Sequence, residues 1–467
     1  VLFRSLIFFS SSLKYPRGTY SRRGLLGDQE PKIFDQLIDH TNPQLGTFKQ
    51  RYIEVLTHYK MGGPVILEIG EETDSLTASG NGTDFLTVLA QDLNAAVVVL
   101  EHRFFGESMP AKTTTSDDYK LLTIQQAIDD LKYFQENYGE ISGIGKTKWL
   151  ITGGSYAGML SALTRKMYPE NFHAAISSSG VVLATDDYND FDLQIAISMG
   201  EECASVARKT RMLVDELLDN EGTKDYVLNL FNSQGLTDQN FRFVIGEMFT
   251  LAPQYGMREK VCGPLVDAHR AGDDLVVALS KYAKDFFIPK FCDGSIYKTY
   301  ADDYFKSLEN TNENVGGRSW LWITCNELAY WQTSPGRLGL RSPKLTKEAF
   351  QEQCKNVFGE GIVPNVNAFN EKYGGLKQTA TRVFFTTGSQ DPWTWTCVTE
   401  ESGVVEGSYA HTITGPNVGH CSDYHLPKAT DQIDLVRTRK NMRDVIKVWM
   451  NEERSEERRV GKECRSR

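Results

Sequence analysis

The chain has 467 residues, of which 40% are hydrophobic and 24% charged, and its formal net charge is −10. These fractions are typical of a globular protein and exclude a disordered, collagen-like or coiled-coil chain. The acidic balance offers no electrostatic footprint for nucleic acid or anionic lipid, and no apolar run reaches the roughly 20 residues of a membrane-spanning helix. Neither a nucleic acid nor a membrane is therefore an expected partner.

The two ends of the chain are set apart from the fold prediction. Residues 1–5 and 454–467 read like in-frame translations of sequencing-library adapters, so we assign neither range to the fold. Residues 6–30 contain a short apolar run followed by small residues, which is typical of the end of a truncated signal peptide or of a stray apolar leader.

Cysteines and a sequon indicate the compartment. Seven cysteines remain once Cys464 in the tail is set aside, and none forms a C-x-x-C pair, so we expect neither a zinc ribbon nor a thioredoxin-like site. No metal site and no cofactor are expected. An odd number leaves at least one thiol free or paired outside the chain. A sequon at Asn81 lies in a Gly/Ser/Thr-rich stretch that is typical of an exposed, glycosylated loop. Together these features favour a secreted, lysosomal or vacuolar protein over a cytosolic one.

Residues 31–182 form the first part of the predicted core. Short β-branched runs at 64–69, 95–100, 149–152 and 174–177 suit strands that are buried on both faces of a parallel sheet. Helical patterns lie between them, at 84–93, 124–137 and 157–168. Strands that alternate with helices in this way predict an α/β fold with right-handed crossovers.

The strand pattern then stops and later returns. Residues 183–308 show only helical patterns and are predicted to form a helical insertion. Over 309–453 the α/β pattern returns, with strands at 382–387 and 410–414 and a helix from about 435 to 450. An interrupted and resumed sheet describes a hydrolase core that carries a helical cap.

The motif G-G-S-Y-A-G at 153–158 carries the predicted chemistry. A strand leads into it and a helix follows, which is the context of a nucleophile elbow, so Ser155 is the predicted nucleophile. The alternative is a glycine-rich turn with a helix-capping serine. Ala157 stands where the strict motif has glycine, and its small side chain keeps the turn feasible.

Two backbone amides are needed to stabilise an oxyanion. The first expected donor is the N–H of Tyr156, directly after the nucleophile, and the second comes from Gly70 or Glu71 in the loop after the strand at 64–69. The acidic pair Glu71–Glu72 is either a solvated turn or a binding site for a substrate amine.

A nucleophilic serine needs a base and an orienting acid, which follow it in the order acid, histidine in this fold. The strand at 382–387 ends in G-S-Q-D-P-W and places Asp391 on its following loop, and the next strand ends in G-P-N-V-G-H-C and places His420 on the next loop. His411 falls inside a predicted strand and His425 lies beyond the loop apex, so His420 is the predicted base.

Several motifs in one order make the chain resemble the S28 family of serine peptidases, and within it the thymus-specific type with its plant and protist relatives. The resemblance runs from about residue 34 to 450 and rests on F-D-Q-L-I-D-H-T-N-P at 34–43, L-E-H-R-F-F-G-E-S at 100–108, G-G-S-Y-A-G-M-L, T-C-N-E at 324–327, G-S-Q-D-P-W and G-H-C-S-D. It implies an α/β-hydrolase fold with a helical cap and the triad Ser155, Asp391 and His420. It also implies exopeptidase action beside proline, as a carboxypeptidase in one branch and a dipeptidyl peptidase in another.

The resemblance further implies a proline pocket formed by Met159, Trp393, Tyr330 and Tyr424. The two tyrosines replace the usual methionine and tryptophan of the carboxypeptidase branch, so we expect a preference for proline that tolerates small residues such as alanine.

Disulfide pairing is expected only in part. Cys325 and Cys354 match a disulfide of the family, whereas Thr333 stands where the family has the cysteine that would serve Cys203, so Cys203 is expected to lack its partner. Cys397 and Cys421 lie on the predicted acid and base loops, and a bond between them stays an open alternative.

The predicted function is therefore that of a serine exopeptidase acting on peptide substrates. The alternatives are an esterase or lipase on the same fold and an inactive hydrolase-like binding protein. A lipase would more often show an apolar lid and an H-G-G oxyanion strand, and the sequence shows neither feature. An inactive relative would lack a triad residue, and none of the three is replaced in this sequence. The end of the peptide that is attacked and the oligomeric state, monomer or homodimer, stay open.

Overall fold

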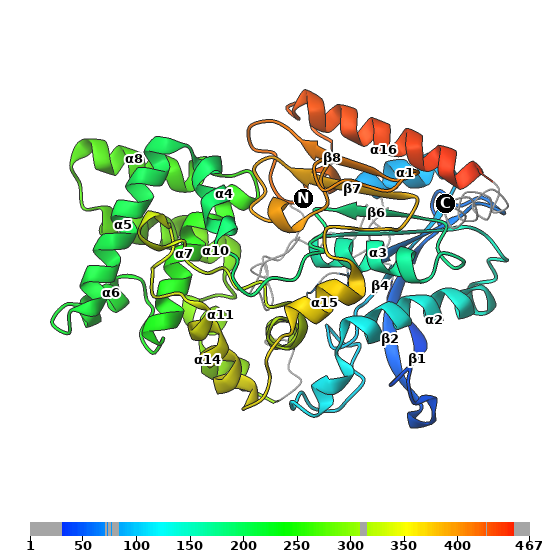
Figure 1. The fold of residues 1–467 in the computed structure, drawn as a ribbon, viewed down its shortest axis with the longest axis horizontal. Coiled ribbons are helices and arrows are strands. Elements are labelled where there is room, and N and C mark those ends of the chain that lie inside the picture. Colours follow the sequence, from blue (N-terminus) through cyan, green and yellow to red (C-terminus); the bar gives the residue numbers. More distant parts are fainter. Residues whose placement is uncertain are drawn as a thin grey trace.

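An eight-stranded sheet organises one half of the molecule (Figure 1). The protein is represented by a computed structural model that describes residues 30–70, 72, 76, 84–308, 315–425 and 427–452. The adapter-like ends, nearly all of the leader, Asn81 and Glu71 lie outside these residues, so the expectations for them stay predictions.

The strand order is β1-β2-β4-β3-β5-β6-β7-β8. The first two strands pair antiparallel with each other, β2 pairs antiparallel with β4, and every other pairing is parallel. This mixed sheet with crossover helices is an α/β-hydrolase fold, as predicted. The strands are β1 (Lys32–Leu37), β2 (Thr47–Val55), β3 (Val65–Ile69), β4 (Ala96–Leu100), β5 (Trp149–Gly154), β6 (Ala174–Ser178), β7 (Val383–Gly388) and β8 (Tyr409–Ile413).

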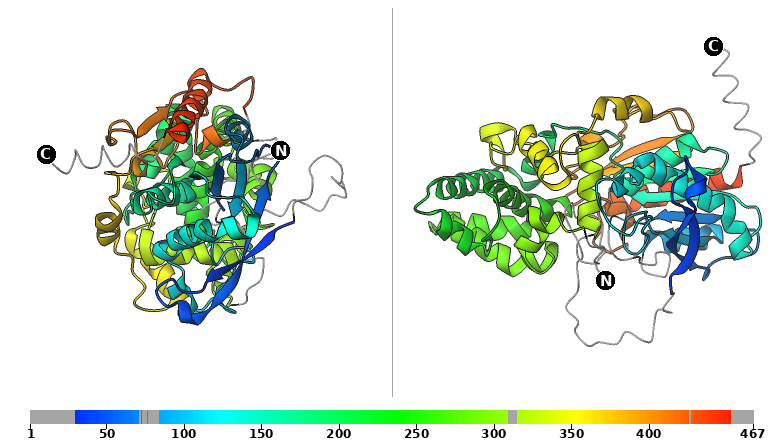
Figure 2. Two further views of the ribbon diagram at one scale, coloured as in Figure 1. Left: turned by 90° about the vertical axis from the view of Figure 1, so that its right-hand side faces the viewer. Right: turned by 90° about the horizontal axis from the view of Figure 1, so that it is seen from below.

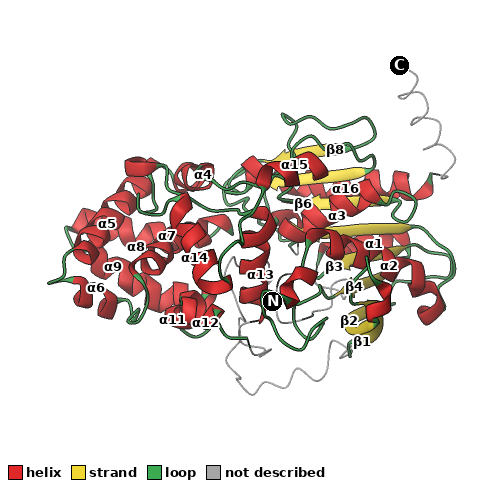
Figure 3. Ribbon diagram, turned by 60° about the horizontal axis from the view of Figure 1, so that its bottom comes forward, coloured by secondary structure: helices red, strands yellow, loops and turns green. Residues whose placement is uncertain are grey.

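Helices cover both faces of the sheet because its strands bury alternate residues on opposite sides. Val65, Leu67 and Ile69 of β3 join the cluster that contains α2 (Ile124–Ser142) and α3 (Ser155–Met167). Ile66, between them, joins the cluster on the other face. That second cluster is closed by α1 (Phe85–Leu93) and α16 (Ile433–Asn451), which lie side by side in Figures 1 and 3.

Between β6 and β7 the chain leaves the sheet and builds a helical lobe beside it, as two further views show (Figure 2). Within the described residues strands return only with β7, and the boundary expected at residue 308 stays a prediction. The helices between β6 and β7 are α4 (Asp190–Met199), α5 (Glu201–Asp219), α6 (Lys224–Leu230), α7 (Asp238–Gln254), α8 (Glu259–Ala271), α9 (Leu275–Tyr282), α10 (Ile288–Phe291), α11 (Ile296–Tyr300), α12 (Asp302–Phe305), α13 (Val315–Ile323), α14 (Lys347–Phe358) and α15 (Val366–Tyr373). Of these, α15 lies on the sheet half beside α3 (Figure 1), where the ammonium group of Lys166 donates to the carbonyl of Tyr373.

The helix α7 is the centre of this lobe. Every residue from Asn240 to Gln254 is buried, which is the pattern of a helix packed on all sides. It contacts α4, α5, α8 and α11. No helix in the described ranges is long and apolar enough to cross a membrane.

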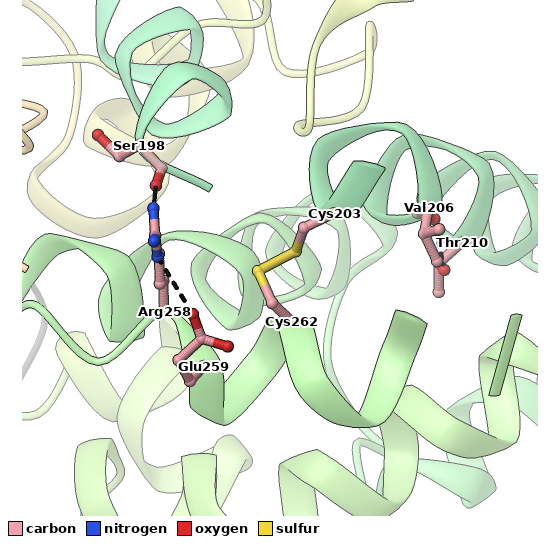
Figure 4. The surroundings of a disulfide bond; sticks show 7 residues. All are labelled: Ser198, Cys203, Val206, Thr210, Arg258, Glu259 and Cys262. Atoms are coloured by element: carbon pink, nitrogen blue, oxygen red, sulfur yellow. Dashed lines mark hydrogen bonds and ion pairs between the residues drawn. A yellow bond between two sulfur atoms is a disulfide. The ribbon is translucent and has the colours of Figure 1, made fainter. Parts of the chain in front are cut away.

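Two disulfides tie helices together. Cys325 and Cys354 are bonded, as the family resemblance implied. The expectation that Cys203 lacks a partner is wrong, because α5 and α8 pack side by side and bring Cys203 and Cys262 together, with 5.4 Å between their Cα atoms (Figure 4). Arg258, just before α8, also donates a hydrogen bond to the carbonyl of Ser198 at the end of α4.

Cys397 and Cys421 are both buried free thiols, so the open alternative of a bond between them is excluded. Their sulfur atoms face different neighbours: the thiol of Cys397 donates to the carbonyl of Trp393, and that of Cys421 lies 3.7 Å from the carbonyl of Ser178.

Candidate active site

The predicted nucleophile lies at a strained turn. Ser155 is the first residue of α3, directly after β5, and its φ of +54° lies in the left-handed region that non-glycine residues rarely adopt. The turn needs glycines around it: a Cβ on Gly153 would lie 2.5 Å from the backbone of Ala157, and one on Gly158 would lie 2.8 Å from the carbonyl of Ser178. These close approaches explain the small residues of the motif and match a nucleophile elbow.

The predicted acid and base form a buried pair. Nδ1 of His420 lies 2.8 Å from both carboxylate oxygens of Asp391, and neither residue is exposed to solvent. Because a carboxylate only accepts hydrogen bonds, Nδ1 carries the proton and Nε2 is left with its lone pair. Oδ1 of Asp391 also accepts the backbone N–H of Trp393 at 2.9 Å, and Oδ2 accepts the hydroxyl of Thr387 at 3.3 Å.

The loop that carries His420 is held next to the serine turn. A Cβ on Gly154 would lie 3.0 Å from the sulfur of Cys421, so the residue after His420 packs on the residue before Ser155. Asp423 fixes the same loop to the sheet, since its carboxylate accepts the hydroxyls of Ser178 and Thr386 on β6 and β7.

Two buried polar atoms, one on Ser155 and one on His420, have no hydrogen-bond partner among the described residues. They are the hydroxyl oxygen of Ser155 and Nε2 of His420. A proton acceptor and a hydroxyl left open in this way suit a base and a nucleophile whose hydrogen bond tightens when substrate binds.

The helical lobe also holds the predicted base, a contact that sequence reasoning missed. The backbone N–H of His420 donates to the carbonyl of Gln254, the last residue of α7, at 2.7 Å. The approach is so close that a Cβ on Gly419 would lie 2.1 Å from that carbonyl oxygen, and one on Gly256 would lie 2.3 Å from the carbonyl of Asn417. The only sequence signal was the Pro-Gln-Tyr-Gly run at 253–256, which predicts a helix end and not its neighbour.

The two competing histidines have other surroundings. His411 lies in β8, as predicted, and forms ion-pair contacts with Glu400 and Asp434 at 2.9 Å and 3.2 Å. His425 lies beyond the turn that carries His420, and burial lowers its pKa to about 4. Of the three histidines, it is His420 that forms the hydrogen bonds to Asp391.

Of the expected oxyanion donors, the amide of Tyr156 is available and that of Gly70 is already hydrogen-bonded. Tyr156 is the second residue of α3, where a backbone N–H has no acceptor within the helix, so its amide is available. Gly70 is not: its N–H donates to the carbonyl of Leu100 at 2.8 Å, because the β3–β4 ladder continues one residue beyond Ile69. Of the two alternatives for the second donor, Gly70 is therefore excluded, and Glu71 lies outside the described residues and stays a prediction.

Three of the four predicted pocket residues come together. The ring of Trp393 lies 5.5 Å from that of Tyr330 and 6.5 Å from that of His420. The hydroxyl of Tyr330 contacts the sulfur of Met159 at 3.6 Å and donates to the carbonyl of Val181. All are buried, so they form an apolar, aromatic wall beside the predicted base.

Tyr424 does not join this wall. Its hydroxyl contacts that of Thr152, its ring lies 6.4 Å from Phe85, and it belongs to the apolar cluster on the α1/α16 face of the sheet. Cys421 has a φ of +51°, and the one-turn helix that follows it carries Tyr424 to that face. The wall instead gains Tyr188 and Phe191, whose rings lie 5.3 Å and 5.0 Å from that of Trp393.

A histidine from the L-E-H-R motif supports the nucleophile helix. The hydroxyl of Tyr156 lies 3.0 Å from Nε2 of His102, while Nδ1 of His102 lies 2.7 Å from the carbonyl of Arg103. Because the carbonyl only accepts, Nδ1 donates and Nε2 accepts the tyrosine proton. Burial lowers the pKa of His102 to about 4, so the ring is neutral at neutral pH. The L-E-H-R motif indicated the family, but it did not predict the contact between His102 and Tyr156.

One buried carboxylate, that of Glu72, has no hydrogen-bond partner in any other described residue. Both of its oxygens are buried. Loss of hydration raises the pKa of Glu72 to about 8. The described residues contain no group of three or more His, Cys, Asp and Glu side chains that could hold a metal ion.

Comparison with known proteins assigns the family. The family model described as serine carboxypeptidase S28 matches residues 36–442. The probable serine protease EDA2 of Arabidopsis thaliana is 31% identical over 442 residues, which cover 90% of this chain and 88% of that protein. The thymus-specific serine protease of Mus musculus is 27% identical over 87% of this chain and 84% of its own length. A probable extracellular serine carboxypeptidase of Arthroderma benhamiae is 28% identical over 74% of this chain and 55% of its own. The match over most of the sequence shows that the chain is a serine-type peptidase and belongs to the serine carboxypeptidase S28 family.

Proposed function

We propose that the protein is a serine exopeptidase that hydrolyses peptide bonds at or after proline through an acyl-enzyme on Ser155. The observation that carries this proposal is the buried pair of Asp391 and His420, joined at 2.8 Å, next to a serine in a left-handed turn. A hydrolase-like binding protein would have no need to keep these three groups together.

The geometry supports a definite order of proton transfers. Asp391 accepts Nδ1–H of His420, so Nε2 takes the proton of Ser155 as its oxygen attacks the peptide carbonyl. The N–H of Tyr156 stabilises the oxyanion that forms. His420 then gives the proton to the leaving amine, and a water molecule releases the acyl group by the same steps in reverse.

The pocket supports proline beside the bond that is cut. Proline is compact and rigid and lacks a backbone N–H, so it suits an apolar pocket that offers no hydrogen-bond acceptor to that nitrogen. Met159, Tyr330 and Trp393 form such a wall, and the hydroxyl of Tyr330 is already bonded within the protein. Small residues such as alanine should fit less well but still bind, because such pockets discriminate by only about 1–3 kcal/mol per methylene.

The two disulfides support a role in the secretory pathway, as a secreted or lysosomal enzyme, since such bonds persist in oxidising compartments. Its substrates would then be peptides that reach those compartments.

Fluorophosphonate labelling followed by a substrate panel tests the proposal. Wild type should be labelled and should cleave proline peptides faster than p-nitrophenyl esters. Ser155→Ala should abolish the label and lower turnover by about 10⁴- to 10⁶-fold, because the hydroxyl is a reactant. His420→Ala should be almost inactive, whereas the control His411→Ala should stay close to wild type.

Three results would count against the proposal. Turnover of Ser155→Ala within tenfold of wild type removes that serine from the mechanism. Ester hydrolysis without peptide hydrolysis makes the protein an esterase. A preference for bulky or charged residues beside the cleaved bond removes the proline assignment.

A further inference from the structure

The side chain of Gln254, the last residue of α7, is a buried carboxamide without a hydrogen bond. It is not exposed to solvent, and neither its Nε2 nor its Oε1 has a hydrogen-bond partner among the described residues. Gln378 also has an open Oε1, but its Nε2 donates to the carbonyls of Tyr373 and Gly375. A buried amide that leaves both a donor and an acceptor unpaired lowers the stability of the fold, so its presence needs an explanation.

The backbone of Gln254 places this carboxamide at the predicted base. Its carbonyl accepts the N–H of His420 at 2.7 Å. The next residue, Tyr255, sets its ring edge-on to that of His420, with 6.3 Å between the ring centres. The end of α7 is therefore in direct contact with the loop that carries the base.

The helix α7 turns the side chain of Gln254 toward the aromatic wall of the pocket. Residues 247, 250 and 254 are spaced by three and four, so they lie on one face of α7. On this face Glu247 and Thr250 both accept from Nη2 of Arg341. The guanidinium of Arg341 lies 5.3 Å from the ring centre of Phe191, which belongs to the wall. Gln254 thus lies on the side of α7 that faces the wall, at the end that touches the base.

The wall and the predicted base meet at this end of α7. The ring of Trp393 lies 5.0 Å from that of Phe191 and 6.5 Å from that of His420. His420 must reach the amine of the bond that is cut, so a substrate residue seated against Trp393 has its main chain close to His420. The carboxamide of Gln254 borders the same region.

A peptide main chain is the partner that a carboxamide matches. Nε2 of a glutamine donates and Oε1 accepts, and a peptide chain supplies both carbonyl groups and N–H groups. A simple ester supplies a carbonyl but no N–H. Proline has no N–H either, so the matching N–H belongs to a residue beside the proline.

We propose that the carboxamide of Gln254 binds the main chain of the peptide substrate beside the proline, with Nε2 donating to a carbonyl and Oε1 accepting an N–H. This inference rests on the proposed peptidase function and deepens it, because it explains how the site distinguishes peptides from other acyl compounds. The helical lobe then contributes a hydrogen-bonding residue to substrate binding in addition to the aromatic side chains of the wall.

Gln254→Met tests the proposal, because it keeps the length of the side chain and removes both hydrogen-bonding atoms. The backbone carbonyl that holds His420 is unchanged. The variant should lower kcat/KM for short proline peptides by about 10- to 100-fold, as expected for two lost hydrogen bonds. Hydrolysis of p-nitrophenyl acetate and the rate of fluorophosphonate labelling need the triad but no peptide main chain, so both should change by less than threefold.

Thermal unfolding separates substrate binding from a structural role. Removal of an unpaired buried amide should raise Tm, by about 2 °C. A structural role predicts the opposite, so a fall in Tm or a failure to fold would overturn the proposal. Thr250→Val is the matched control, because it lies one turn earlier on the same face and its hydroxyl is bonded within the protein. It should leave the ratio of peptide to ester hydrolysis unchanged.

Substrate variants identify the group that Gln254 contacts. Each main-chain N–H of a proline peptide, other than that of the bond that is cut, is methylated in turn. At one position the loss of kcat/KM in wild type should exceed the loss in Gln254→Met by about five- to tenfold, because the variant has already lost that contact. Equal losses in both proteins at every position would overturn the assignment to the main chain.

The outcomes separate this inference from the proposed function. A Gln254→Met enzyme with unchanged peptide hydrolysis, beside a wild type that is labelled and cleaves proline peptides, refutes the role of Gln254 alone. Equal losses on peptides and on p-nitrophenyl acetate also refute it, because they show damage to the triad. Absence of labelling or of any cleavage at proline in wild type refutes the proposed function itself.

Discussion

Asp391→Asn should silence the enzyme by forcing His420 into the wrong tautomer. In the structure Oδ1 of Asp391 accepts two N–H groups, that of the Trp393 backbone at 2.9 Å and that of His420 at 2.8 Å. The backbone N–H is an obligatory donor, so the single oxygen of an asparagine must stay opposite Trp393. Its NH₂ group then occupies the position of Oδ2, facing both Thr387 and His420.

An NH₂ group facing Nδ1 can only donate, so Nδ1 must accept and the ring proton moves to Nε2. A histidine protonated at Nε2 cannot take the proton of Ser155. The equivalent loss in serine proteases is about 10⁴-fold in kcat, which corresponds to about 5.5 kcal/mol of transition-state stabilisation. The hydroxyl of Thr387 can rotate to accept from the new NH₂ group, so the fold should persist.

Steady-state kinetics on a proline p-nitroanilide measures the loss, and thermal unfolding verifies the fold. Thr387→Val is the control, because it removes only the weaker contact to Oδ2 at 3.3 Å and should lower kcat by less than tenfold. A folded Asp391→Asn enzyme with more than a tenth of wild-type kcat would refute the argument from the tautomer.

Three further predictions concern stability and specificity. Replacing Cys203 and Cys262 by serine opens a bond that spans 59 residues and should lower the free energy of unfolding by about 4 kcal/mol, and a loss below 1 kcal/mol in denaturant titration would contradict this. The folded-state pKa of His102, about 4, lies below its ordinary 6.5, so its contribution to stability is complete above pH 6.5 and is lost as the pH falls toward 4. Roughly 3 kcal/mol should disappear over that range, and His102→Gln should show a shallower fall in unfolding titrations; identical falls would refute it. Tyr330→Phe should change the proline-to-alanine ratio of kcat/KM, whereas Tyr424→Phe should leave that ratio unchanged and cost about 1 kcal/mol of stability; the reverse pattern would return Tyr424 to the pocket.

The sequence predicts the parallel strands well and the first two strands not at all. Strands such as β4 are buried on both faces and read as continuous apolar runs. In β1 and β2 the buried positions include Gln36 and Gln50, whose side chains hydrogen-bond each other at 2.9 Å. A buried polar pair hides the apolar alternation on which strand prediction depends.

In the candidate site, too, the sequence predicts what local motifs determine and misses what depends on packing between distant segments. Ser155, Asp391 and His420 follow strands or begin a helix, and their positions follow from motifs that one stretch of sequence contains. The bond from Cys203 to Cys262, the amide of Gly70 and the place of Tyr424 depend on how distant segments pack. A single sequence carries no record of such packing, so the expectations for Cys203 and Tyr424 were wrong, and Gly70 is excluded as one of the two alternatives for the second oxyanion donor.

The contact between Gln254 and His420 has a consequence for how the molecule can be altered or opened. A hydrolase whose insertion is a detachable lid can lose it and keep a working core. Here the carbonyl of Gln254, the last residue of α7, accepts the backbone N–H of His420, the predicted base. Gly256 and Gly419 lie so close to the opposite backbone that a side chain at either position would clash. A swing of the helical lobe away from the sheet would break this hydrogen bond to His420, so we expect the joint to stay closed when a substrate enters. For the same reason a minimal core made by deleting the lobe would lack a fixed base.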